Sequence, residues 1–299
     1  MKNLIYLLIA PPLFFTSCQN DEQAVSEETV QVSFTAELPQ QMGTRASSAL
    51  SVDKVYCAVF ENGEEIQNLR GEIGITEGQN IVFAPRLIKG RTYDIVFWAS
   101  KDGSYNVTDM TAITRNASIP EADYDAFTAT TEITVEGNHS EGITLKRPIA
   151  QLNMGVTPED WNGVANPNTF NMEPSTITLK IDGKSTFNAL TGNATGTESE
   201  ITYNLSVSGA GFTCKENTYK SIAMCYVLAE SEKQNINITY SIYDENGNAI
   251  QEDRQIIHVP LQMNYATYVV GGLLTGTIGY SITLDEELLT DDEHSKEIE

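Results

Sequence analysis

The sequence predicts an all-β protein built from two antiparallel β-sandwiches, with little helix. The first observation is a series of about a dozen short apolar segments separated by polar turns, which is typical of antiparallel strands. The second is that a single short segment carries the start signal of a helix. The third is size: 299 residues, 40% of them hydrophobic, exceed one compact sandwich. Because a sheet with one apolar face buries it against another sheet, we expect two sandwich domains.

Composition excludes several classes of function. The chain has 18 Lys and Arg against 41 Asp and Glu, and 18 − 41 gives a net charge of −23, which would repel nucleic acid. Its three histidines, His139, His258 and His294, lie far apart and form none of the paired spacings that hold zinc on one helix face. We therefore expect no nucleic-acid partner, no metal, no cofactor and no enzyme activity.

The first 17 residues read as a signal peptide. Lys2 is followed by the apolar run Leu4–Ala10, which is too short to span a membrane and ends at Pro11-Pro12. Thr16-Ser17 before a lone cysteine resembles a lipoprotein signal-peptidase box of the Bacteroidales type. Cys18 would then become the acylated first residue of the mature chain and anchor it in the outer membrane. The alternative is a plain secretory signal with a chance cysteine.

Residues 18–28 form an acidic tether. Gln19-Asn20-Asp21-Glu22 follows the cysteine directly. An acidic patch at this place looks like a signal for export to the cell surface, and it is equally well explained as a solvated linker.

The clearest strand of the chain is Val30–Leu38, in which apolar and polar residues alternate throughout. Val55–Phe60 is apolar on both faces and leads into Asn62-Gly63, a dipeptide typical of tight hairpins. The remaining strands expected before residue 157 are Tyr93–Ala99, Thr131–Glu136, and a fifth that joins Gly142–Lys146 to Ile149–Val156 and is broken at Pro148.

The second half repeats the pattern of strands and turns. Asp182-Gly183 and Asn246-Gly247 are predicted hairpin turns, and the Gly- and Thr-rich segment Thr191–Thr197 is a predicted flexible loop. Thr157–Trp161 is the best helix candidate, with Thr157 as the cap and Pro158 in the first helical position, and it supports one turn. The strands expected here are Thr176–Ile181, Ile201–Val207, Ser221–Leu228, Ile236–Asp244, Ala249–Val259, Tyr265–Leu274 and Thr277–Leu284.

These segments predict a domain boundary near Pro148. The first sandwich would comprise residues 29–148 and the second residues 149–284, followed by an acidic tail at 285–299 that frays.

Three cysteines remain after Cys18. An odd number allows at most one internal disulfide, and Cys214 and Cys225 could face each other across a hairpin. The other interpretation is that these two, and Cys57, are isolated buried thiols. No histidine motif supports a catalytic cysteine.

Three stretches together resemble a known family. They are Leu145–Asn153, Val259–Thr275, and the signal box at Cys18 with its acidic tether. This combination is similar to the fimbrillin superfamily of Bacteroidales, whose members are lipoprotein precursors of type V pili and their accessory proteins. Met263 stands where fimbrillins often have an arginine before the Asn-Tyr pair, a departure that concerns the stalk subfamily more than the superfamily. The resemblance implies two transthyretin-like β-sandwich domains.

The resemblance also implies a way of assembling. In polymerising members an arginine-specific protease removes the first strand, and the groove accepts an extended segment of another pilin subunit by donor-strand exchange, a form of β-strand addition. Here Val30–Leu38 would be removed by cleavage between Arg45 and Ala46, and Arg45 is the only arginine before Arg70. The donor would be residues 277–284, in which the apolar positions are Ile278, Tyr280, Ile282 and Leu284.

Other interpretations remain open. Val30–Leu38 could be a permanent edge strand, Arg45 an ordinary loop arginine, and residues 277–284 the closing strand of their own sheet. At the level of function, the first hypothesis is a pilus subunit, or a pilus-associated anchor or tip component, with a role in adhesion to host or bacterial surface ligands. The alternative is a non-polymerising surface lipoprotein that binds glycans or other ligands through exposed aromatic residues. We expect Trp98, inside an apolar strand, to belong to the core instead.

Overall fold

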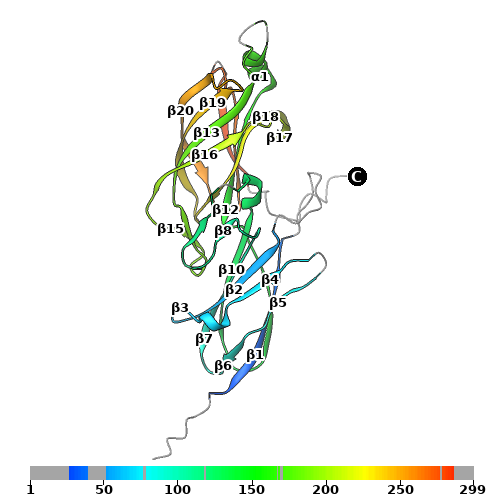
Figure 1. Cartoon of the computed structure of the whole chain (residues 1–299), viewed down its shortest axis with the longest axis vertical. Coiled ribbons are helices and arrows are strands. Elements are labelled where there is room, and N and C mark those ends of the chain that lie inside the picture. Colours follow the sequence, from blue (N-terminus) through cyan, green and yellow to red (C-terminus); the bar gives the residue numbers. More distant parts are fainter. Residues whose placement is uncertain are drawn as a thin grey trace, which may run out of the picture.

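The protein is an elongated all-β molecule, with the strands of its first half at one end and those of its second half at the other (Figure 1). The all-β, sandwich-type fold predicted from the sequence is confirmed. The computed structural model describes residues 27–39, 52–76, 79–117, 119–166, 168, 171–276 and 278–285.

The first half contains eleven strands and two short 3₁₀ turns among its described residues. Its elements are β1 Thr29–Glu37, β2 Lys54–Glu61, β3 Glu64–Glu65, η1 Gln67–Leu69, β4 Gly71–Gly74, β5 Ile81–Phe83, β6 Arg86–Ile88, β7 Thr92–Ser100, β8 Tyr105–Asn106, β9 Ile113–Arg115, η2 Glu121–Tyr124, β10 Ala126–Thr134 and β11 His139–Thr144.

The second half contains one helix and another set of strands. Its elements are β12 Ile149–Val156, α1 Pro158–Ala165, β13 Pro174–Gly183, β14 Thr186–Asn188, β15 Asn193–Thr195, β16 Ser199–Ser206, β17 Gly211–Cys214, β18 Asn217–Leu228, β19 Gln234–Asp244, β20 Ala249–Leu261, β21 Ala266–Gly271 and β22 Tyr280–Asp285.

Each half has its own pair of facing sheets. In the first half the sheets are β11-β1-β5, with β6 also on β1, and β10-β7-β2-β3, with β4 also on β2. Phe34 of one sheet and Phe97 of the other lie in the shared core. In the second half the order β17-β18-β12-β21-β22 faces β16-β13-β19-β20, and Leu152 and Ile242 are in the core between them. The sheets face each other because apolar residues alternate with polar ones along the strands, and the apolar faces are buried against one another.

The sheets are not antiparallel throughout. β1 runs parallel to β11, and β12 runs parallel to β21, while every other ladder among the described strands is antiparallel. In both halves the first strand thus lies beside one that comes much later in the chain. Local periodicity in the sequence does not predict this pairing of distant segments.

The prediction of one strand broken at Pro148 is wrong. β11 ends at Thr144 in one sheet, and β12 starts at Ile149 in another. Proline has no N–H to donate to a ladder, so a break there separates two strands more readily than it bends one.

A fifth sheet joins the two halves. It has the order β15-β14-β9-β8, so the β14–β15 hairpin of the second half pairs with strands of the first. Two predictions fail at this hairpin. β13 continues through Asp182-Gly183, where a turn was expected, and Thr191–Thr197 contains strand β15 instead of being a loop throughout. Both short strands depend on partners far away in sequence.

Several local predictions are confirmed. Asn62 and Gly63 have φ angles of 53° and 82°, the positive values that a tight hairpin turn requires. Thr157 caps α1 and accepts a hydrogen bond from the Asp160 N–H at 3.1 Å, although the helix has eight residues where one turn was expected. Within the part of the chain that the structure describes, no helix is long and apolar enough to span a membrane.

Candidate strand-exchange site

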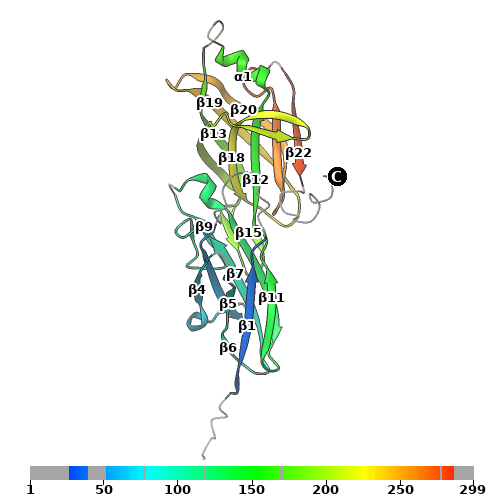
Figure 2. The same ribbon diagram turned by 90° about the vertical axis from the view of Figure 1, so that its right-hand side faces the viewer.

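The first strand is an internal member of its sheet (Figure 2). On one side β1 pairs with β11 from Val32↔His139 to Glu37↔Thr144. On the other side its first residues pair with β6 and its later residues with β5. The interpretation of Val30–Leu38 as a permanent edge strand is therefore wrong. Removing this strand would leave two unpaired ladders facing each other across the gap.

The side chains of β1 alternate between the core and the outer face of the sheet. Val32, Phe34 and Ala36 are buried, while Thr29, Gln31 and Glu37 are exposed. Phe34 is completely buried and packs edge-to-face on Phe97, with ring centroids 6.4 Å apart. This strand thus supplies a central part of the core of the first half.

Polar contacts hold the beginning of β1. Gln31 Nε2 donates to the Ala84 carbonyl at 2.7 Å, and Arg86 Nη2 donates to the Thr29 carbonyl at 3.1 Å. Lys89 forms an exposed ion pair with Glu28 at 3.2 Å. Exposed pairs of this kind add little stability, so the buried side chains and main-chain ladders determine how firmly β1 is held.

The last described strand has the opposite character. Among the described strands, β22 lies at the edge of its sheet and pairs with β21 alone, from Ala266↔Asp285 to Gly271↔Tyr280. None of its six residues is buried. Tyr280 in β22 and Ile278, two residues before the strand, are each 46% exposed. β22 thus carries an alternating apolar face that its own sandwich covers incompletely.

Two glycines let the segment before β22 approach the sheet. A Cβ on Gly272 would lie 2.4 Å from the Ile278 carbonyl oxygen, and one on Gly271, whose φ is 145°, would lie 2.5 Å from the Gly279 oxygen. The close approach therefore requires glycine at both positions. Nearby, the buried Asp160 carboxylate of α1 accepts from the Leu274 N–H at 2.7 Å and fixes the start of this connection.

The predicted modification sites are not part of the described structure. Cys18, Arg45 and Ala46 all lie outside the described residues, so lipidation and cleavage remain predictions. The acidic tail beyond Asp285 lies outside them as well.

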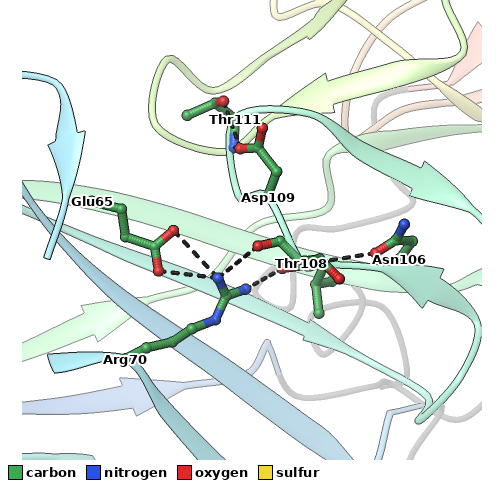
Figure 3. Close-up of polar contacts among 7 residues, drawn as sticks. Glu65, Arg70, Asn106, Thr108, Asp109 and Thr111 are labelled. Carbon is green, nitrogen blue, oxygen red and sulfur yellow. Dashed lines mark hydrogen bonds and ion pairs between the residues drawn. The ribbon is translucent and has the colours of Figure 1, made fainter. Parts of the chain in front are cut away.

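The other arginines of the chain are built into the fold. Figure 3 shows the Arg70 guanidinium between the Glu65 carboxylate, 3.0 Å away, and the Thr108 carbonyl, 2.9 Å away. Asn106 and Asp109 cap the backbone of the same loop. The remaining pairs are Arg86 with Thr29, Arg91 with Glu61, Arg115 with Glu121, Arg147 with Asp125, and Arg254 with Tyr240.

The cysteines have the properties of structural thiols. Cys57, Cys214 and Cys225 are all free and buried, so the predicted alternative of a Cys214–Cys225 disulfide is wrong. Burial raises the pKa of Cys57 to about 12, which keeps the thiol protonated and unreactive. No three His, Cys, Asp or Glu side chains among the described residues are grouped as a metal ion would require.

Sequence reasoning found both strands of this site but missed what holds them. Alternation identified β1 and β22. The glycine pair and the Asp160 contact were missed, and the adjacent Gly271-Gly272 inside an apolar run was the available signal.

The geometry defines a class of protein: a two-sandwich β-protein in which the first of the described strands is buried and internal and the last of them is exposed and at a sheet edge. The chain belongs to the family DUF6562, a family of unknown function, whose model matches residues 22–299. No curated protein matches this sequence.

Solved structures that match this chain include proteins from Bacteroides and Porphyromonas. A candidate adhesin from Bacteroides ovatus is 11% identical, with a TM-score of 0.50, and the match covers 86% of this chain and 95% of that one. The tip fimbrial protein Mfa3 of Porphyromonas gingivalis is 11% identical over 86% of this chain and 99% of that one, with a TM-score of 0.48. The fimbrial anchor protein Mfa2 of the same species is 10% identical over 86% and 96%, with a TM-score of 0.46. At these identities the Bacteroides ovatus match shows a shared fold, in agreement with the two-sandwich fold that the resemblance implied.

Proposed function

We propose that this chain is a fimbrillin-like surface lipoprotein, a pilus subunit or a pilus-associated anchor or tip component that assembles by β-strand addition. The observation that carries the proposal is the position of β1 between β11 and the β5–β6 pair. A strand at this place can be replaced only by another extended segment, because its loss would leave buried apolar side chains and two ladders of backbone groups in water.

The interior contacts of β1 determine the route of exchange. Three of its side chains are buried in the core, so the strand does not leave spontaneously after the chain has been cut. A donor that brings its own alternating apolar side chains can restore the same contacts as it enters.

β22 has the properties that a donor requires. It contributes no buried residue to its own sandwich, and within the described part of the chain its one ladder is that with β21. Leaving that position costs one ladder, and entering the place of β1 in another copy gains two. The apolar positions Ile278, Tyr280, Ile282 and Leu284 recur at every second residue, as the inward positions of β1 do.

Cleavage after Arg45 would separate β1 from the rest of the chain, so that a donor strand could displace it. The six arginines between residues 52 and 285 have their side chains engaged in the contacts given above, and Arg86, Arg115 and Arg254 also have their backbone within strands. Arg147 precedes a proline, which hinders cleavage at that bond. The side chains of Arg86 and Arg254 are exposed, but both residues lie in paired strands, whose backbone a protease cannot bind in extended form without breaking the ladder. We therefore expect the folded protein to be cut poorly at these six arginines, which supports Arg45-Ala46 as the processing point.

The adhesion role and the surface location come from the sequence and from the related structure. The signal box predicts a lipid on Cys18 and hence an outer-membrane anchor. The structure that shares this fold at a TM-score of 0.50 is described as a candidate adhesin. The proposal contains no catalytic step and no cofactor.

The alternative, a non-polymerising surface lipoprotein that binds glycans, lacks the platform it needs. Tyr280 is the only aromatic side chain among the described residues that is more than about one third exposed. Trp98 is fully buried and Trp161 is 5% exposed, so neither is available to stack on a sugar ring.

The test replaces the cleavage-site arginine in the organism that makes the protein. Arg45→Lys keeps the positive charge but removes the side chain that an arginine-specific protease recognises. We expect the unmodified chain to give a ladder of oligomers in unheated detergent gels and Arg45→Lys to give monomer. The matched control is Arg254→Lys, on an exposed position of β20, which should leave the ladder unchanged. A ladder that persists in Arg45→Lys would contradict processing at this site, and a monomer in all three strains would contradict polymerisation.

A further inference from the structure

The two halves share a third hydrophobic core. Its members come from both sides of residue 148: Trp98 and Tyr105 belong to the first half, and Phe187 and Leu228 belong to the second. Phe187 is fully buried, and its ring centroid lies 5.5 Å from that of Trp98.

This shared core explains an unusual feature of the sequence. The strand β2 is apolar on both faces, whereas a sandwich strand ordinarily has one face in water. Val55, Cys57 and Val59 point into the core of the first half, and Tyr56, Ala58 and Phe60 point into the shared core. The second face is therefore buried only when the elements that cover it are in place.

The β14–β15 hairpin is one of those covering elements, and it belongs to the second half. β14 pairs with β9 through Thr186↔Thr114 and Phe187↔Ile113. At its end the Ala189 N–H donates to the Met110 carbonyl at 2.8 Å, and the Ala189 carbonyl accepts from Thr130 Oγ1 at 2.6 Å. The hairpin thus forms hydrogen bonds with two parts of the first half: β9 with the residues just before it, and β10.

Beside the hairpin, a group of polar contacts also joins the first half to the second. Arg115 of β9 donates to the Tyr226 carbonyl of β18 at 2.6 Å and to Glu121 at 2.6 Å. Glu121 in turn accepts from the Tyr226 N–H at 2.8 Å. The guanidinium lies 3.6 Å from the ring centroid of Tyr124 and 5.0 Å from that of Tyr203, which again joins a residue of each half.

We infer that the β14–β15 hairpin locks the two sandwiches into one cooperative unit, so that neither half unfolds or separates alone. The lock has a mechanical consequence: tension applied at one end of the molecule passes into the other half through packed side chains and ladder hydrogen bonds instead of through a free linker. This inference does not depend on the proposed function, because it concerns the contacts within a single chain.

The two tryptophans make the inference testable in the whole chain. Trp98 lies in the shared core on the side of the first half, and Trp161 lies on α1 in the core of the second half. Trp98→Phe and Trp161→Phe therefore give two proteins, each with one reporter. The Trp98 indole N–H has no hydrogen-bond partner among the described atoms, so Trp98→Phe removes no hydrogen bond.

Each tryptophan replacement changes stability by its own amount, so the comparison is made within each protein, between fluorescence and circular dichroism, which reports both halves. The two signals should have the same urea midpoint in each protein. Phe187→Ala, introduced into each, should lower stability and separate the two signals, with Trp98 fluorescence lost at lower urea than the circular dichroism signal. A fluorescence midpoint that differs from the circular dichroism midpoint while Phe187 is intact would overturn the inference, as would a Phe187→Ala change that moves neither fluorescence curve.

A milder variant covers the case in which Phe187→Ala does not fold. Thr130→Val is nearly isosteric and removes the bond to the Ala189 carbonyl, and it should move both curves to lower urea by the same amount. The matched control, Thr178→Val, removes an exposed hydroxyl contact within the second sandwich and should leave both midpoints in place. Movement of the Trp98 curve alone in Thr130→Val would overturn the inference.

Discussion

The replacement of Phe34 by alanine tests the claim that the buried side chains of β1 hold the strand in place more firmly than the polar contacts at its beginning. Phe34 is 0% exposed and stacks edge-to-face on Phe97. Phe→Ala changes in a core cost about 3–5 kcal/mol, through lost transfer free energy and the cavity that remains. Two neighbouring ladders fix the backbone of β1, so the site cannot collapse around the missing ring, and we expect the upper part of this range.

The assay is urea unfolding of the chain with Cys18→Ser, which removes the site of acylation. At a slope of about 2–3 kcal/mol per molar urea, a loss of about 4–5 kcal/mol corresponds to a midpoint lowered by about 1.3–2.5 M. The matched control is Thr35→Ala on the same strand, whose side chain points away from the core and which should cost less than about 1 kcal/mol. A Phe34→Ala protein within about 1 kcal/mol of the unmodified chain would show that the burial of Phe34 does not hold β1.

Three further changes have expected outcomes. Gly272→Ala places a Cβ against the Ile278 carbonyl and should speed hydrogen exchange in β22, and unchanged protection would show that the close approach is not required. Asp160→Asn weakens the charge-assisted bonds to the backbone after β21 and should cost about 1.5–3 kcal/mol in thermal unfolding, against no change if these bonds are dispensable. Burial raises the pKa of Cys57 from 9.0 to about 12. Above pH 9 the unfolded chain loses this proton and the native chain keeps it, so stability should fall between about pH 9 and 12. The fall per pH unit is at most about 1.4 kcal/mol for this group, and Cys57→Ala should reduce it.

Much of the fold could be predicted because it depends on local patterns in the sequence. Strict alternation identified β1, and a run apolar on both faces identified β2 as a buried strand. The Asn62-Gly63 turn and the Thr157 cap were found because each depends on residues within three or four positions.

The rest depends on contacts between distant residues. β14 and β15 are three residues long and are stabilised by β9 and the shared core, so Thr191–Thr197 carries no strand signal of its own. The parallel pairing of β1 with β11 joins segments about a hundred residues apart. It decides that β1 is internal, a fact on which the proposed exchange rests and which alternation alone cannot supply.

The removal of β1 is tested most directly by the intact mass and amino-terminal sequence of the protein recovered from the surface of its own cells. If β1 is removed, the recovered chain begins at Ala46 and is found in oligomers. A chain that still begins at an acylated Cys18 and is found as a monomer would contradict the removal of β1.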